Sequence, residues 1–219
     1  MRRLLGWLGL LGGILSVEGQ AQTNPVETHG RWALGISRSV STLSAGSIGQ
    51  SEDGVEIAWA PYRPALWGLS LAYGKAGMRV GLTGRYGRAG LGARGKAIGD
   101  DGNSSARALI VEEGVYDVFT ATASVSTHLL RLRGGPALRP SLGVGIQVWS
   151  ALGESARVIP GAQGGLALEM DLIGPFVAAL EGELGFTPAS PFRREEMPDN
   201  YRLRSTWRRT LGAAVSWRF

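Results

Sequence analysis

The sequence predicts an all-β protein that folds as an eight-stranded antiparallel up-and-down transmembrane β-barrel. Three observations predict this fold. Stretches of about ten residues in which apolar and polar side chains alternate recur along the chain. The connections between these stretches are short and long in turn. The first 21 residues have the pattern of a cleaved export signal, so the rest of the chain is expected to work outside the cytoplasm.

The export signal is predicted from charge, length and small residues. Met1-Arg2-Arg3 precedes 14 uncharged residues, and Gly19-Gln20-Ala21 follows with the small side chains that signal peptidase accepts. A run of 14 residues is shorter than the roughly 20 that a transmembrane helix needs. We therefore expect residues 1–21 to be removed and residues 22–219 to form the barrel domain. An uncleaved anchor is the alternative.

Eight strands account for the mature chain. The alternation is clearest in the last of them, where Leu211, Ala213, Val215 and Trp217 share one face and small or charged residues share the other. The predicted strands are 31–42, 54–74, 78–90, 115–133, 138–150, 157–172, 176–188 and 203–219.

The connections predict how the strands are joined. Short turns follow the second, fourth and sixth strands, whereas longer polar loops occupy residues 43–53, 91–114 and 189–202. Short turns at one rim and long loops at the other are typical of membrane barrels. One face of each strand carries Leu, Val, Trp and Phe, and the other carries mainly Gly, Ser, Thr, Arg and Glu, which suits a narrow lumen.

The end of the chain carries a resemblance to a known family. Val215-Ser216-Trp217-Arg218-Phe219 resembles the terminal strand of bacterial outer-membrane β-barrel proteins. The whole mature chain looks like the small barrels of the OmpA transmembrane-domain, OmpX and OmpW type. This resemblance implies an outer-membrane location, contact with outer-membrane lipid, and recognition of Val215, Trp217 and Phe219 by the barrel assembly machinery. Unlike OmpA, we expect no peptidoglycan-binding domain after the last strand.

Charged side chains on the small-residue face are the candidate site. Charges inside a barrel must pair, because an isolated ion out of water costs several kcal/mol. We expect a static network that fills the lumen, and a gated ion path is the alternative. The candidate residues are Arg79, Arg85, Arg139, Glu169, Asp171, Glu181, Glu183, Arg208 and Arg218.

No catalytic residue, cofactor or metal site is expected. The chain has no cysteine and two histidines, which leaves little for thiolate chemistry or a histidine-based triad. Ser126 and His128 lie two residues apart, but the strand phase directs both into the lumen without an orienting carboxylate. Asp100 and Asp101 could bind calcium weakly, although a solvated turn is the better interpretation.

The net charge of +5 does not indicate nucleic-acid binding, because the arginines alternate with acidic residues and the chain has no basic block.

Three other features concern the lipid-facing surface. Aromatic residues near strand ends predict girdles at the headgroup level. Arg38 falls on the lipid-facing side, which predicts a bulge that turns it inward. The prolines at 61 and 64 interrupt the second strand, so Val55–Ala60 could project above the membrane.

Three functions remain open. A structural or surface-interaction role is the first, with loops 43–53, 91–114 and 189–202 as possible contacts for a partner. A narrow pore for ions or small solutes is the second. A soluble periplasmic ligand-binding barrel is the third, and it requires the apolar face to line the interior.

Overall fold

The computed structural model describes residues 30–50, 55–75, 77–98, 104–131, 135–151 and 155–219. The predicted signal peptide, His29, Asp100 and Asp101 lie outside these residues. All regular secondary structure within them is β-strand. No helix long and apolar enough to cross a membrane occurs in this part of the chain.

Eleven strands are described. They are β1 (Arg31–Leu43), β2 (Ser47–Gln50), β3 (Glu56–Lys75), β4 (Met78–Ile98), β5 (Ser104–Thr127), β6 (Leu130–Arg131), β7 (Ala137–Ala151), β8 (Arg157–Asp171), β9 (Phe176–Thr187), β10 (Arg202–Leu203) and β11 (Thr206–Arg218).

Eight of these strands close into a ring, as the alternation predicts. β1, β3, β4, β5, β7, β8, β9 and β11 are each antiparallel to the next, and β1 pairs with both β3 and β11. Each residue in the ring has a register partner on the next strand. A path from partner to partner that starts at Val158 of β8 passes through Arg38 of β1 and returns to β8 at Leu168, which is ten residues further along the strand. This stagger tilts the strands, and tilts of about 35–45° are usual in membrane barrels.

The apolar face of the ring points outward. Leu142 and Leu211 on separate strands are 74% and 75% exposed. The side chains that point into the ring are small, hydroxylic or charged over most of its length, and many of them are buried. This arrangement contradicts the soluble periplasmic barrel, because that alternative needs the apolar face inside.

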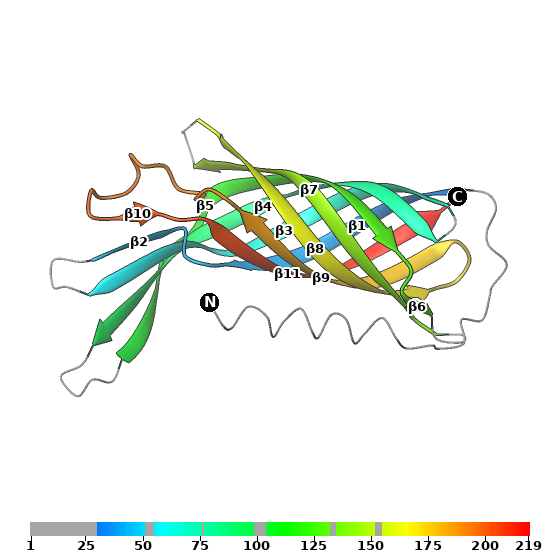
Figure 1. The fold of residues 1–219 in the computed structure, drawn as a ribbon, viewed down its shortest axis with the longest axis horizontal. Coiled ribbons are helices and arrows are strands. Elements are labelled where there is room, and N and C mark those ends of the chain that lie inside the picture. The colour runs from blue at the N-terminus through cyan, green and yellow to red at the C-terminus, as the bar shows by residue number, and fades with distance from the viewer. Residues whose placement is uncertain (1–29, 51–54, 76, 99–103, 132–134, 152–154) are drawn as a thin grey trace, which may run out of the picture.

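The three long connections are not simple loops. The apolar run Ala108-Leu109-Ile110-Val111 predicts a strand extension within 91–114, which is confirmed, whereas the strands within 43–53 and 189–202 were not predicted. β4 continues to Ile98 and β5 begins at Ser104, so most of 91–114 is strand. The connection 43–53 contains β2, which pairs with β3 and with β10 from the connection 189–202. Figure 1 shows β2, β10 and the adjoining ends of β3, β4 and β5 projecting beyond the ring. We call this the long-loop end and the opposite rim the short-turn end.

The proline-interrupted strand is continuous through a local irregularity. The register between β3 and β4 shifts between Tyr62 and Ala65, and Arg63 has a φ of 39°. A bulge of this kind accommodates residues that cannot complete a regular ladder. The sequence leaves open whether Val55–Ala60 is a projecting strand or a separate short piece. In the structure the segment from Glu56 onwards is strand continuous with the rest of β3, and it pairs with β2 from Glu56 to Trp59.

The predicted bulge at Arg38 is wrong. The register of β1 with β11 and with β3 is unbroken from Ala33 to Val40. Arg38 therefore keeps the lipid-facing orientation that its position dictates, and its guanidinium lies 5.1 Å from the ring centroid of Trp67. A cation over an indole face recovers part of the cost of leaving water.

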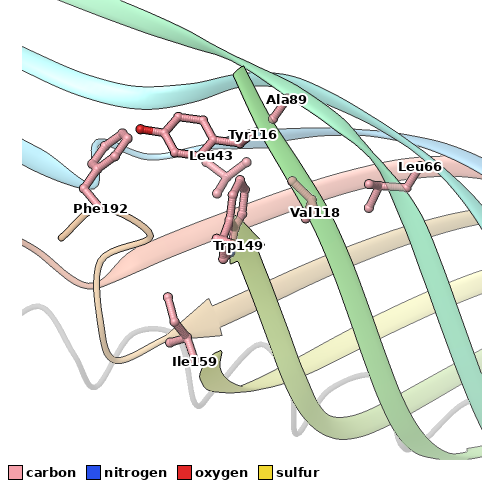
Figure 2. Packing of buried hydrophobic residues seen from close by; sticks show 8 residues of the cluster. All are labelled: Leu43, Leu66, Ala89, Tyr116, Val118, Trp149, Ile159 and Phe192. Carbon is pink, nitrogen blue, oxygen red and sulfur yellow. The ribbon is translucent and has the colours of Figure 1, made fainter. Parts of the chain in front are cut away.

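The buried apolar residues gather at the long-loop end, inside the mouth of the ring (Figure 2). They come from several strands and from the connection 188–201, and they close around Phe192, which is 0% exposed. The cluster is Leu43, Leu66, Ala89, Tyr116, Val118, Trp149, Ile159 and Phe192.

Candidate functional site

One charged layer of the lumen, near the short-turn end, is organised around Glu169. Its carboxylate lies 2.7 Å from Arg79, 3.1 Å from Arg139 and 3.1 Å from Arg218. Asp171, two residues further along β8, lies 3.2 Å from Arg218. The Glu169 side chain is only 8% exposed, so three guanidinium groups converge on one nearly buried carboxylate. We call this the Glu169 layer.

The alternation of β8 explains why Glu169 and Asp171 share the lumen with these arginines. Residues two apart on a strand point to the same face, and β8 pairs directly with β7, which carries Arg139. Arg79 comes from β4, which is not a neighbour of β8, so its bond to Glu169 crosses the lumen. His128, just beyond β5, contacts Arg139 through Nε2 at the same level.

The second layer is deeper in the barrel and is organised around Arg85. Its guanidinium makes a two-pronged contact with Glu183 at 2.7 and 2.5 Å, and lies 3.5 Å from Glu181. β4 and β9 stand on opposite sides of the ring, so this ion pair spans the lumen. A Cβ at Gly68 would lie 2.9 Å from Cγ of Arg85, and glycine there leaves room for the side chain to cross. We call this the Arg85 layer.

The Arg85 layer predicts a strong response to removing its carboxylates. Arg85 is 5% exposed, and replacing both Glu181 and Glu183 with Gln leaves its charge without an anion. Uncompensated buried charge costs about 3–5 kcal/mol. We expect the double variant to unfold in urea with a free energy lower by about 3 kcal/mol. A double variant that unfolds like the wild type would show that this layer does not stabilise the barrel.

A polar cavity of about 130 Å³ adjoins both layers. Side chains of both layers line it together with Ser124, Ser126 and Gln163. A separate pocket of about 10 Å³ lies beside Gln147, Gln163 and Arg208, where Arg208 donates to the Gln163 side-chain oxygen at 2.8 Å. The cavity is therefore polar but narrow.

Beside Arg208 and towards the long-loop end, hydroxylic and then apolar side chains line the lumen. Ser41 and Thr210 are hydrogen-bonded at 2.8 Å, and the hydroxyls of Thr187 and Thr206 are also in contact. Above them lies the cluster around Phe192, whose ring centroid is 6.0 Å from that of Tyr116. An apolar layer across a pore is a barrier to ions because it offers no hydrogen-bonding groups.

The connection that carries Phe192 is anchored by its own polar contacts. The Phe192 amide donates to Ser190 Oγ at 3.0 Å, and Arg157 donates to the Phe192 carbonyl. Arg193 donates to the Ser155 carbonyl, and Arg194 donates to the Tyr201 carbonyl. These bonds hold the connection folded into the mouth of the ring.

The structure places all nine candidate residues on the lumen side. Eight of them join the two ion-pair layers, whereas Arg208 bonds to an amide. Sequence reasoning missed Gln163 and Phe192. Phe192 follows Pro191 and precedes two arginines, so it has no periodic neighbours that would mark it as buried. His128 faces the lumen as predicted.

The exterior carries aromatic groups at both rims. Trp32 and Tyr73 form a ring pair with a centroid distance of 5.1 Å near the short-turn end. Near the long-loop end, Tyr86 donates to Asp117 at 3.0 Å, and Asp117 pairs with Arg88 at 3.3 Å. Their ring bodies are apolar and their tips polar, which fits the girdles predicted at the headgroup level. The predicted girdle residues are Trp32, Trp67, Tyr73, Tyr86, Phe176, Phe186, Trp207, Trp217 and Phe219.

Comparison with known proteins finds likeness of fold. No protein-family model matches the chain, and no curated protein matches it. The solid-state NMR structure of outer membrane protein AlkL in lipid bilayers aligns with 88% of this chain and 91% of its own, at 13% identity and a TM-score of 0.51. The fold is that of a small outer-membrane β-barrel.

Other solved barrels align over a similar share of the chain. Ail of Yersinia pestis, crystallised with the heparin analogue sucrose octasulfate, has 17% identity over 87% of this chain and 99% of its own, with a TM-score of 0.44. The N-terminal β-barrel domain of OprF from Pseudomonas aeruginosa has 14% identity over 87% and 100%, with a TM-score of 0.42.

Proposed function

We propose that the chain is an outer-membrane protein whose barrel is a closed anchor and whose projecting strands contact a partner at the cell surface. The apolar exterior, the aromatic rims and the likeness to outer-membrane barrels support the location. The sheet built from β2, β3, β4, β5 and β10 supports the surface role, because it extends ordered backbone well beyond the ring. The segments concerned are those at 43–53, 91–114 and 189–202.

The observation that carries the closed barrel is the packing of its long-loop end. Phe192 is fully buried within the mouth, and a pocket of about 10 Å³ lies beside Arg208. One water molecule needs about 10–15 Å³ in a cavity measured this way. A continuous aqueous path would require the 188–201 connection and Arg208 to move.

A narrow pore is the second candidate. The polar cavity supports it, and so does the arrangement of Arg85, which lies near two carboxylates and could exchange its bond with Glu183 for one with Glu181. Ion current through single reconstituted molecules separates this candidate from the closed anchor.

We propose no enzymatic role for the chain, as its sequence also leads us to expect. His128 Nε2 is in contact with the Arg139 guanidinium of the Glu169 layer, so this nitrogen already accepts a hydrogen bond within the lumen. Recognition of Val215, Trp217 and Phe219 by the barrel assembly machinery stays part of the proposal. The three side chains lie on the lipid-facing side of the last strand and just after it.

The location and orientation can be tested with single cysteines, because the chain has none of its own. Asp199 at the long-loop end and Ile173 at the short-turn end are both fully or almost fully exposed. We expect a membrane-impermeant maleimide to label Asp199→Cys on intact cells and Ile173→Cys only after the outer membrane is permeabilised. Equal labelling of the two on intact cells, or recovery of both in the soluble periplasm, would contradict the proposal.

A further inference from the structure

A hollow of about 560 Å³ lies on the lipid-facing side of the barrel. It is lined by residues of β1, β3, β8, β9 and β11, which include the short side chains of Ala178 and Ala213 and the larger ones of Ile36, Leu168 and Leu180. Its volume is within the range of small-molecule sites, about 300–1,000 Å³. We call it the Arg38 groove, after the charged residue that lines it.

Arg38 makes this groove different from ordinary lipid-facing surface. It lies on the outward face of β1, level with Ala213 on one side and Trp67 on the other. Its contact within the described residues is the face of Trp67, and no carboxylate in that part of the chain is ion-paired with it. An arginine on the lipid face is among the costliest residues there, so an anion beside it would be strongly favoured.

The groove has a polar end and an apolar end. Trp67 is the register partner of Tyr86. Tyr86 donates a hydrogen bond to Asp117 near the long-loop end. Arg38 itself is closer to the long-loop end of β1, five residues from Leu43 and seven from Arg31. From there the groove runs past Ala213 towards Met170, near the last residue of β8 at the short-turn end.

We propose that the Arg38 groove binds an anionic lipid of the leaflet at the long-loop end, with its charged headgroup on Arg38 and one acyl chain along Ala213 and Ala178. Along the groove, a cation beside an indole is followed by an apolar channel. In an anionic lipid, a charged headgroup is likewise followed by an apolar acyl chain. A second copy of the chain fits less well, because a two-fold interface on this face would bring two Arg38 side chains together.

The inference rests on the proposed membrane location, so its test uses purified refolded protein whose folding is checked separately. The full chain is placed in micelles with equal amounts of phosphatidylglycerol and phosphatidylcholine that carry the same acyl chains. Native mass spectrometry then counts the lipids retained. We expect the wild type to retain phosphatidylglycerol in preference by roughly fivefold, the factor for one arginine beside an anionic headgroup.

Two variants distinguish recognition of the lipid headgroup from binding of its acyl chain. Arg38→Gln is expected to lower the preference to near one, and Ala213→Trp is expected to reduce retention of both lipids because it fills the groove. Arg88→Gln is the matched control, since Arg88 is also an exposed arginine on the exterior but is paired with Asp117. We expect it to keep the wild-type preference.

Folding of each variant is verified by the difference in gel mobility before and after boiling, so failure to form a barrel is distinguished from failure to bind lipid. Equal retention of the two lipids by a folded wild-type barrel would overturn the inference. So would an unchanged preference in Arg38→Gln, an equal loss in Arg88→Gln, or recovery of a dimer that excludes lipid from this face.

Discussion

Replacing Glu169 with Gln should destabilise the barrel more than any other single change to a lumen carboxylate. Glu169 is ion-paired with Arg79, Arg139 and Arg218 at 2.7 to 3.1 Å, and these three side chains come from three different strands. The glutamine keeps the shape but removes the charge, so the arginines repel one another in a poorly hydrated space. We expect the free energy of unfolding in urea to fall by about 3–5 kcal/mol.

Asp171→Asn is the matched control for this change. Asp171 is on the same strand and pairs with the same Arg218, but its side chain is 48% exposed and Arg218 keeps Glu169. An exposed pair contributes about 0–1 kcal/mol. Equal losses in the two variants would show that the convergence on Glu169 has no special weight. The double variant Glu169→Gln, Arg139→Gln should recover part of the loss, since it removes one of the repelling cations.

Replacing Phe192 with Ala should release the connection 188–201 from the mouth of the ring. The phenyl ring is fully buried against Tyr116 and its neighbours, and truncating a buried Phe costs about 3–5 kcal/mol. The cost falls on local opening rather than on the barrel, because the ring is held by the ladders of its eight strands. Opening would expose Arg193 and Arg194 to trypsin.

We expect trypsin to cleave Phe192→Ala about 100-fold faster than the wild type after Arg193 or Arg194, since cleavage follows the population of the open form. Met197→Ala is the control, because Met197 lies in the same connection and is packed only against the edge of the cluster. It should change the rate far less. Equal cleavage of the wild type and Phe192→Ala would show that the ring does not hold the connection closed.

The fold could be predicted because a two-residue period records which face of each strand meets lipid. Every lumen candidate was found from this period alone, with Arg79 and Glu169 as examples. Their partners could not be predicted. The bond from Arg79 on β4 to Glu169 on β8 crosses the lumen, and it depends on the stagger of the closed ring rather than on spacing along the chain.

The errors have equally local causes. β4 and β5 continue through a glycine-rich stretch, and the register shifts between Ala89 and Gly92 break the alternation that would have revealed it. Arg38 breaks the pattern of its strand and suggests a bulge, yet the neighbouring Trp67 accommodates it without one. Phe192 stands alone in a polar connection, where a period carries no information.

Ion current through the reconstituted wild-type protein tests the closed anchor most directly. In planar bilayers at high salt we expect no resolved single-channel steps from the wild type, because the layer around Phe192 and the constriction beside Arg208 block the path. Phe192→Ala serves as the positive comparison, since it removes the outer barrier. Regular conductance steps from the folded wild type would contradict a closed barrel and identify the lumen as a pore.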